Sequence, residues 1–293
     1  IRATPALDNG RLYVAGMRDV LVCLDAADGR QLWRIDFPEQ LKTSLPAFGC
    51  VSSPLIVGDK LFMQAADSFV CIDKRTGTIA WRTLEEPAGM ATGGAFSSPM
   101  RAVFAGRECV LVQTRQRLAC VEAESGETLW SHDIPAFRGM NILTPTVIED
   151  SVFTSTYGGG SFLLAVDAND AAVSAAQLWK NKLQGYMSSP VVIDGNIYVH
   201  LSNQRFACIE SKSGDIRWIS KPFGKYWSLV AQGDRILALD ERGDLLLIQA
   251  HPEKFDLVDS RHISDDPTWA HLAVAGREVF VRTLHGLRAY RWE

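Results

Sequence analysis

A thirteen-residue pattern that ends in tryptophan recurs through the chain, and it constrains the fold more than any other feature. Clear copies are LVCLDAADGRQLW at 21–33, FVCIDKRTGTIAW at 69–81, LACVEAESGETLW at 118–130 and FACIESKSGDIRW at 206–218. A further copy, LLAVDANDAAVSAAQLW, ends at Trp179 and lacks the glycine of the others. The shared positions are the closing tryptophans Trp33, Trp81, Trp130, Trp179 and Trp218, and the glycines Gly29, Gly77, Gly126 and Gly214.

Each copy is preceded by a second pattern of two short apolar segments around a Gly or Asp turn, such as SSPLIVGDKLFM from residue 52. Such turns tolerate the positive φ angle that a tight hairpin needs. Together the two patterns give seven repeats, at about 3–33, 52–81, 97–130, 144–179, 188–218, 228–263 and 271–293. Four antiparallel strands in about 40–50 residues is the period of a propeller blade. The sequence therefore predicts an all-β protein with one β-propeller domain over residues 1–293.

The repeated tryptophan has a structural interpretation. A single blade cannot cover both of its faces, so neighbouring blades must stack. We expect the tryptophan to lie on the outer strand as an apolar plate against the next blade, with its indole N–H bonded to a backbone carbonyl there. The glycine is expected to make the turn that orients it.

The cysteines follow the same repeat. Cys23, Cys71, Cys120 and Cys208 occupy one position of the third strand in four repeats, which predicts small buried side chains rather than disulfides. A bridge between Cys109 and Cys120, on adjacent strands, stays open because the strand register is not known from sequence.

The motif A-x-D-x-x-x-G-x-x-x-W resembles the tryptophan-docking motif of the PQQ-like β-propellers. That superfamily contains quinoprotein alcohol dehydrogenases and the outer-membrane assembly scaffold BamB. The segments SSP, WKNK at 179–182 and GDLLLIQAHPE at 243–253 are most similar to PQQ-like repeat proteins of the planctomycete type. The resemblance covers the whole chain and implies the propeller fold. Because its motifs are docking residues, it does not by itself assign an activity.

Net charge and hydropathy exclude some classes of function, and the chain ends bear on the length of the parent protein. A formal net charge of -4 argues against a nucleic-acid binder, and no apolar run reaches the ~20 residues of a membrane span. The chain begins at Ile1, so any signal peptide is expected upstream. The seventh repeat stops without a Gly turn or outer strand. We therefore expect a fragment of a longer protein, and we hypothesise a parent ring of eight blades.

Ligands of propellers bind where loops lead into the inner strands and where the second and third strands join, at the mouth of a central funnel. Such loops carry polar and aromatic side chains that could face a ligand, and they are also the ordinary composition of loops. The candidate ligand-binding residues are Arg115, Arg117, Asn141, Tyr157, Arg205, Tyr226, Trp227, Trp269 and His271.

The resemblance raises the question of PQQ with Ca²⁺, which would need arginines for its carboxylates, a tryptophan floor, oxygen ligands and a catalytic base. Arginines, tryptophans and Asn141 are present, but no motif supplies an acidic ligand set or a base, so the catalytic residues stay unknown. Quinoprotein alcohol dehydrogenases commonly have a vicinal disulfide, and this chain has no Cys-Cys pair. The serine pairs that begin with Ser52, Ser97 and Ser188 lack a nucleophile setting, and we expect them to bond backbone groups.

Three functions remain. The favoured one is a non-catalytic, exported scaffold that binds a protein or peptide partner at the funnel mouth, as a periplasmic or secreted monomer without cofactor or metal. The first alternative is a PQQ- and calcium-dependent alcohol or sugar dehydrogenase, or a degenerate relative of one. The second is a carbohydrate-binding module that uses the aromatic residues as stacking platforms.

Overall fold

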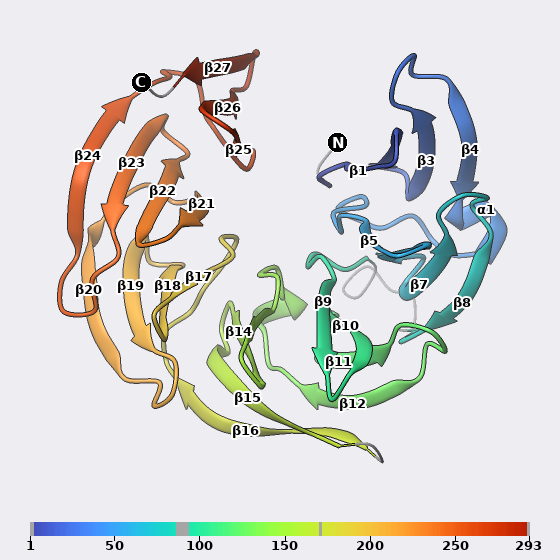
Figure 1. Ribbon diagram of the computed structural model, residues 1–293, viewed down its shortest axis with the longest axis horizontal. Helices are drawn as coiled ribbons and strands as arrows, with labels where there is room; N and C mark the ends of the chain where they lie inside the picture. Colours follow the sequence, from blue (N-terminus) through green and yellow to red (C-terminus); the bar gives the residue numbers. More distant parts are fainter. Residues whose placement is uncertain (1–2, 86–93, 170–171, 292–293) are drawn as a thin grey trace. The chain divides into compact units, whose positions relative to one another are not determined.

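The computed structural model describes residues 3–85, 94–169 and 172–291. Its strands form seven antiparallel sheets, each of them a blade of an all-β propeller, as the repeat predicted (Figure 1). The chain divides into two compact units. The N-terminal unit comprises residues 1–159 and 164–178, and the C-terminal unit comprises residues 160–163 and 179–293. The last two residues of the seventh repeat, 292–293, lie outside the described residues.

Three complete sheets belong to the N-terminal unit. The first contains β1 (Ala6–Asp8), β2 (Arg11–Gly16), β3 (Val20–Asp25) and β4 (Gln31–Asp36). The second contains β5 (Leu55–Val57), β6 (Lys60–Ala65), β7 (Ser68–Asp73) and β8 (Ile79–Thr83). The third contains β9 (Met100–Phe104), β10 (Arg107–Gln113), β11 (Arg117–Glu122) and β12 (Thr128–Asp133). Two short helical segments, α1 (Phe37–Leu41) and η1 (Phe137–Gly139), lie in the connections.

The remaining sheets follow in chain order. The fourth contains β13 (Thr146–Ile148), β14 (Ser151–Thr156), β15 (Gly160–Ala168) and β16 (Val173–Asn181), and residues of its last two strands fall in both units. The fifth contains β17 (Val191–Ile193), β18 (Asn196–His200), β19 (Arg205–Glu210) and β20 (Ile216–Pro222). The sixth contains β21 (Trp227–Gln232), β22 (Arg235–Asp240), β23 (Asp244–Gln249) and β24 (Asp256–His262). The seventh contains β25 (Ala273–Ala275), β26 (Glu278–Arg282) and β27 (Leu287–Arg291).

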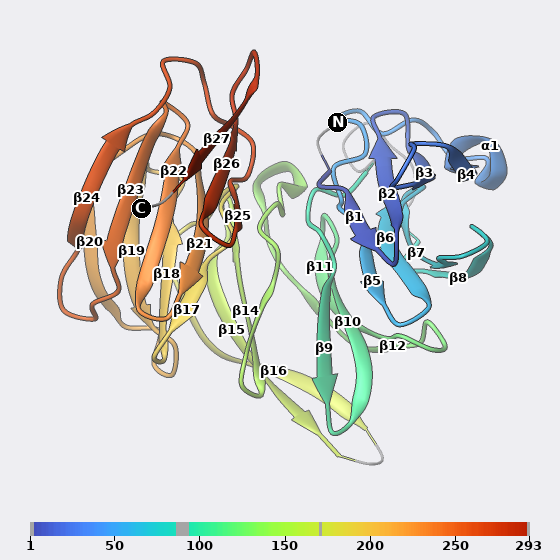
Figure 2. The same cartoon turned by 45° about the horizontal axis from the view of Figure 1, so that its top comes forward.

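The hydrophobic core lies between consecutive blades. In the C-terminal unit the fifth and sixth sheets are stacked face to face, as Figure 2 shows. Tyr198 and Phe206 of the fifth sheet pack there against Trp227, Leu229 and Ile236 of the sixth. A similar cluster joins the first two sheets of the N-terminal unit through Tyr13, Leu21, Leu61 and Val70. The middle strands of the sheets are buried on both faces, which is why strands such as β7 and β19 are mostly apolar.

The register explains why cysteine and tryptophan recur together. Cys23 pairs with Trp33 and Cys71 with Trp81, and each pair is followed at once by a β-bulge. A bulge increases the local twist and redirects the next side chain. All six cysteines are buried free thiols, so the expectation of small buried side chains is confirmed. Cys109 pairs with Glu122, and Cys120 with Leu111, so the two cysteines are diagonal rather than directly opposed neighbours.

The tryptophans dock as expected, with one addition. The indole nitrogen of Trp33 donates to the Lys74 carbonyl of the next blade at 3.2 Å, and that of Trp81 to the Glu124 carbonyl at 3.0 Å. Trp179 and Trp218 make equivalent bonds to Ser211 and His251, both at 2.8 Å. The addition concerns the glycine, which packs beneath the tryptophan of the preceding blade.

The glycine therefore has two roles. Gly77 has φ 78°, which confirms its turn conformation. A Cβ there would lie 2.8 Å from the Trp33 ring, and a Cβ on Gly126 would lie 2.7 Å from Trp81. Each glycine thus belongs to the docking site of the tryptophan before it.

The docking glycine is not required for the indole hydrogen bond, because the sixth repeat lacks it and Trp218 still donates to the His251 carbonyl. Trp130 also precedes a repeat without that glycine. The blade that follows it is the fourth, whose repeat has no glycine in the shared position. The Trp130 ring is buried, yet its indole nitrogen has no hydrogen-bond partner among the described residues. A buried N–H without a partner costs about 1–3 kcal/mol.

The repeated serines connect the inner strands, as expected. The Ser53 hydroxyl accepts from the Thr4 N–H of the preceding blade at 2.9 Å, and the Ser53 N–H donates to the Ser98 hydroxyl at 3.0 Å. Ser97 donates to the Leu143 carbonyl at 3.0 Å. These bonds complete backbone groups where the inner strands begin.

Candidate functional site

The loops that carry the candidate residues lie at one edge of each sheet. In an antiparallel blade the first strand begins where the second strand ends and the third begins. The loops into the first strands and the turns between second and third strands therefore share an edge, which we call the loop edge. It is described below for each unit by itself.

The loop edge of the C-terminal unit carries an aromatic ladder of Tyr186, Tyr226 and Trp269. The rings of Tyr186 and Tyr226 have centroids 6.1 Å apart, and those of Tyr226 and Trp269 are 5.9 Å apart in an edge-to-face arrangement. Trp269 is 73% exposed, and the ammonium group of Lys225 lies 5.2 Å from the centre of the Tyr226 ring. An exposed tryptophan supported by other rings is a rigid apolar surface of the type that anchors protein interfaces.

The loop edge of the N-terminal unit carries a row of phenylalanines and arginines. Phe48 is 51% exposed, and its ring packs edge-to-face on Phe96 with centroids 5.5 Å apart. The guanidinium of Arg115 lies 4.7 Å from the centre of the Phe96 ring. Phe137, which is 52% exposed, makes a similar edge contact with Tyr157.

Two candidates in this unit are fixed by backbone carbonyls. Arg115 is buried, and its guanidinium donates to the Arg138 carbonyl at 2.6 Å. Asn141 is fully buried, and its amide nitrogen donates to the carbonyls of Thr114 and Arg115, each at 3.1 Å. Both side chains hold neighbouring loops together at the loop edge.

Trp227 of the C-terminal unit is likewise a buried residue. Its ring is stacked on His200 with centroids 4.9 Å apart, and its indole nitrogen donates to Asp240 at 3.2 Å. Asp240 also accepts from the Gly224 N–H and from the Arg242 backbone and guanidinium. Burial acts to raise the pKa of Asp240, but these hydrogen bonds hold it below its usual value. Burial lowers the pKa of His200 to about 4.

The remaining candidates are spread over the two loop edges. Arg117 begins β11 and pairs with Asp133 of β12. Arg205 begins β19, and its guanidinium donates to the Ser220 carbonyl at 2.6 Å. His271 is exposed, and its Nδ1 lies 3.2 Å from the Leu272 carbonyl oxygen. Of the nine candidates, Trp269 and His271 are therefore the ones that combine exposure with a place on the C-terminal loop edge, and the half-buried Tyr226 packs against Trp269.

The sequence-derived candidates do not fit PQQ with Ca²⁺. Arg115 and Arg205 have guanidinium groups engaged by backbone carbonyls, and the Asn141 side chain is fully buried. The face of Trp227 is covered by His200. Among residues 3–85, 94–169 and 172–291, no group of three or more His, Cys, Asp or Glu side chains could hold a metal ion.

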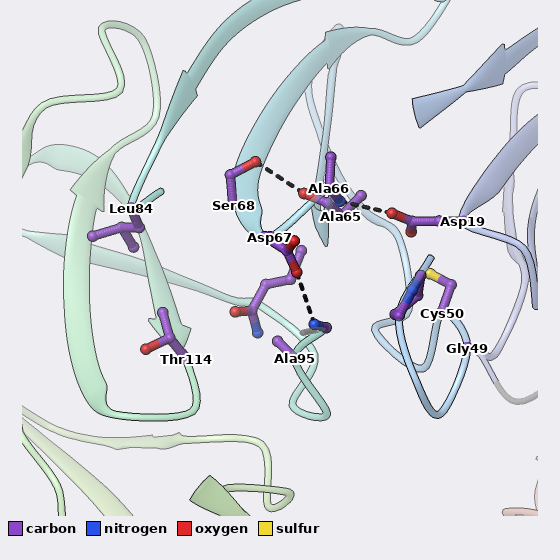
Figure 3. Close-up of a pocket in the computed structure, with 13 residues that line it drawn as sticks. Asp19, Gly49, Cys50, Ala65, Ala66, Asp67, Ser68, Leu84, Ala95 and Thr114 are labelled. Atoms are coloured by element: carbon purple, nitrogen blue, oxygen red, sulfur yellow. Dashed lines mark hydrogen bonds between the residues drawn. The ribbon is translucent and has the colours of Figure 1, made fainter. Parts of the chain in front are cut away.

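A small cavity lies at the N-terminal loop edge, between the loop that contains Gly49 and Cys50 and the turn that contains Ala66 and Asp67. Figure 3 shows Asp19, Cys50 and Asp67 among the residues that line it. Its volume is about 20 Å³. The Ala66 N–H donates to Asp19 at 2.7 Å, and the Gly94 N–H donates to Asp67 at 3.0 Å.

Comparison with known proteins places this architecture in a family. Residues 1–220 match the family model PQQ_2, described as outer membrane protein assembly factor BamB. The chain belongs to this BamB family. No helix of the described residues is long and apolar enough to cross a membrane.

Individual relatives of the BamB family chain are distant. The outer membrane protein assembly factor BamB of Moranella endobia is 22% identical over 276 residues, which cover 82% of this chain and 65% of the relative. The crystal structure of BamB from Moraxella catarrhalis aligns with a TM-score of 0.77 and 15% identity, over 99% of this chain and 85% of that one. A quinohemoprotein alcohol dehydrogenase, ADH IIB of Pseudomonas putida, is 25% identical over 136 residues, 44% of this chain and 20% of the enzyme. This chain thus spans about two thirds of the length of the first BamB relative.

Sequence reasoning missed Phe48, Phe96, Phe137 and Tyr186. A signal for the phenylalanines is present in the BamB family chain, because an Ala-Phe pair precedes three inner strands at 47–48, 95–96 and 136–137. The cavity residues had no comparable signal. Aspartates before a third strand look like ordinary turn residues until the hydrogen bonds around them are known.

Proposed function

We propose that this chain is a non-catalytic, protein-binding scaffold that takes part in outer-membrane protein assembly on the periplasmic side. Membership of the BamB family supports this function, and the relatives that match over most of the chain carry the name of an assembly factor. The observation that carries the proposal is the exposed Trp269, which is supported by the half-buried rings of Tyr226 and Tyr186 on the loop edge of the C-terminal unit.

The ladder suits a protein partner better than a substrate. Its rings project from three different loops and are held by one another, so little side-chain entropy is lost when a partner covers them. Aromatic residues of this kind supply a large share of binding energy at protein interfaces. Lys225 and His271 beside the ladder give the polar rim that such interfaces have.

The test is site-specific crosslinking in cells. A photoreactive phenylalanine in place of Trp269 should give a discrete adduct with one partner protein, and Trp269→Ala should lower the level of folded outer-membrane β-barrel proteins. Leu7, an exposed apolar residue of β1, serves as the matched control position. Adducts at 7 and 269 of equal yield and identity, or unchanged barrel levels in Trp269→Ala, would contradict the proposal.

The dehydrogenase alternative has its own observation, the match to the quinohemoprotein enzyme over 136 residues. It is tested by titrating the protein with PQQ, with and without Ca²⁺, while tryptophan fluorescence is followed. We expect no saturable quenching, because the guanidinium groups of Arg115 and Arg205 donate to backbone carbonyls and the Asn141 side chain is fully buried. Calcium-dependent quenching at micromolar PQQ would restore the enzyme hypothesis.

A further inference from the structure

The cavity beside Asp19 and Asp67 is lined by hydrogen-bond acceptors that the protein leaves unused. The Oδ2 atom of Asp67 is buried and has no hydrogen-bond partner among the described residues. The Gln64 side chain is 95% buried, and its amide nitrogen is engaged by the carbonyls of Ser97 at 2.8 Å and Gln113 at 3.0 Å. Its amide oxygen accepts no hydrogen bond from the described residues, and Gln64 lines the cavity. A group that only donates hydrogen bonds would satisfy both of these acceptors.

Among the described residues, no lysine or arginine side chain forms an ion pair with the two aspartates of the cavity. Neither Asp19 nor Asp67 forms an ion pair within residues 3–85, 94–169 and 172–291. Arg82 is the arginine bonded to the cavity wall: its guanidinium donates to the Ala66 carbonyl at 2.9 Å and to the Ser68 hydroxyl at 2.8 Å, and it forms its ion pair with Glu85. Arg115 directs its guanidinium to the carbonyls of Gly94 and Arg138. A buried carboxylate without a counter-charge is costly, so this site favours a cationic ligand over an empty cavity.

Size and lining distinguish between cations. A cavity of about 20 Å³ accepts a group the size of a water molecule or an ammonium. Ca²⁺ takes six to eight oxygen ligands, whereas the walls here include Pro46, Ala65, Leu84 and Ala95. Apolar walls around acceptors suit an ammonium on an aliphatic stem, whose methylenes pack on carbon while its head donates to oxygen.

We propose that this cavity binds a primary alkylammonium group, the head of a lysine side chain or of a free aliphatic amine. Asp67 and the Gln64 amide oxygen accept from the ammonium, and Asp19 supplies a second negative charge. Phe48 and Phe96, whose rings are in contact, stand on the two loops that line the cavity and offer aromatic surface beside it.

The site is expected to strengthen with pH. Burial raises the pKa of Asp19 to about 6, and the charges of Asp67 and Asp36 add to the rise, while the Cys50 thiol and the Ala66 N–H stabilise the carboxylate. Asp19 therefore gains its negative charge as the pH rises through about 6, and an alkylammonium ion binds better at pH 7.5 than at pH 5.

Backbone amides next to the two carboxylates provide the readout. In ¹H–¹⁵N spectra of the whole chain, n-butylammonium chloride should shift the Ala66 and Gly94 amide resonances saturably. Neither n-butanol nor equal KCl should do so. Asp67→Asn should weaken binding at least tenfold, and Asp19→Asn should remove its pH dependence. Asp150→Asn, an exposed carboxylate of the same unit, should leave both unchanged.

The two sources of the ammonium are separated by a second titration. Tighter binding of Nα-acetyl-lysine N-methylamide than of putrescine identifies a lysine side chain of a protein, and the reverse order identifies a free amine. The proposal fails if neither amine saturates, if n-butanol reproduces the shifts, if CaCl₂ acts at lower concentration than the amine, or if folded Asp67→Asn and Asp19→Asn both bind like the parent protein. These small-molecule outcomes do not depend on crosslinking at Trp269.

Discussion

Aspartates at the loop edges of the two units are used in opposite ways. Asp240 of the C-terminal unit accepts from Gly224, Trp227 and Arg242, and its carboxylate has no acceptor left over. Asp67 of the N-terminal unit accepts one backbone bond and leaves an oxygen without a partner. A carboxylate whose hydrogen bonds are complete stabilises the fold. One whose bonds are incomplete lowers stability and retains the capacity to bind a donor.

The largest expected effect on stability concerns the interface between two blades, where the hydrogen bonds and the packing are complete. Trp81 packs on Phe62, Phe69 and Gly126 and has a bonded indole nitrogen. Trp81→Ala should lower the free energy of unfolding by about 3–5 kcal/mol, because it removes a large buried ring between two blades. Urea denaturation followed by circular dichroism measures it. A loss below about 1 kcal/mol would mean that the seam does not depend on this residue.

The second test uses pH. The folded-state pKa of Asp19 is about 6, above its ordinary 3.8, so the native state holds the proton more tightly than the unfolded chain does. Below about pH 4, Asp19 does not change the free energy of unfolding. Once the pH exceeds 6, Asp19 lowers the free energy of unfolding by up to about 3 kcal/mol. Asp19→Asn should therefore be more stable than the parent at pH 7.5 and equal to it at pH 4. The measurement is the urea midpoint of both proteins at pH 4 and pH 7.5. If the variant and the parent differ by the same amount at the two pH values, the assignment of this pKa to Asp19 is contradicted.

For His200 of the C-terminal unit, stability should change with pH in the opposite direction. Its folded-state pKa is about 4, below its ordinary 6.5, so the unfolded chain binds the proton first. Stability from His200 is present above about pH 6.5 and is lost as the pH falls toward 4. His200→Gln removes this loss, so its midpoint should fall less between pH 6.5 and 4.5 than that of the parent. An identical fall in both proteins would show that His200 is not the group that titrates.

The aspartates themselves provide a matched pair of smaller effects. Asp240→Asn should cost about 2 kcal/mol, because an amide cannot accept all of the bonds that Gly224, Trp227 and Arg242 donate. Asp67→Asn should leave the unfolding free energy unchanged or raise it, since it removes a buried charge without a partner. Thermal melts at pH 7.5 compare the two variants. Equal destabilisation by both would remove the distinction between the loop edges.

The smallest effect concerns the indole nitrogens. Trp81→Phe leaves the Glu124 carbonyl without its donor and should cost about 1–2 kcal/mol. Trp130→Phe removes an N–H that has no partner among the described residues, so the same substitution should be close to neutral there. The measurement is the free energy of unfolding of the two variants in urea. A larger loss for Trp130→Phe than for Trp81→Phe would contradict the view that only the Trp81 indole nitrogen contributes to stability.

The fold could be predicted because its signal is repeated. The same strand-and-turn pattern occurs in seven repeats, so an uncertain strand in one repeat can be assigned from the others. The position of Trp33 or Trp81 relative to glycine already indicates docking between blades. What the repeat did not indicate was the partner of each glycine. The contact between Gly77 and Trp33 joins two repeats, so neither repeat considered alone contains it.

The candidate residues were less predictable for a physical reason. Arg115, Asn141 and Trp227 have the residue types of a ligand site, yet all three side chains are buried and donate hydrogen bonds to backbone carbonyls or to Asp240. Trp269 has the same residue type as Trp227 and is exposed. Whether a polar or aromatic loop residue is free for a ligand depends on contacts with other blades, which residue type does not encode. The ligand-binding role of the candidates stays a prediction.

The docking of each tryptophan on the following blade's glycine has a consequence for the evolution of chain length. The contact runs from head to tail: Trp33, Trp81 and Trp179 each pack on the glycine of the following blade, so the second blade carries both a docking tryptophan and a docking glycine. Duplication of one whole repeat of the gene therefore leaves all existing seams intact and adds a compatible one. Loss of the glycine, as in the fourth and sixth repeats, leaves the tryptophan–glycine contacts between the other blades in place.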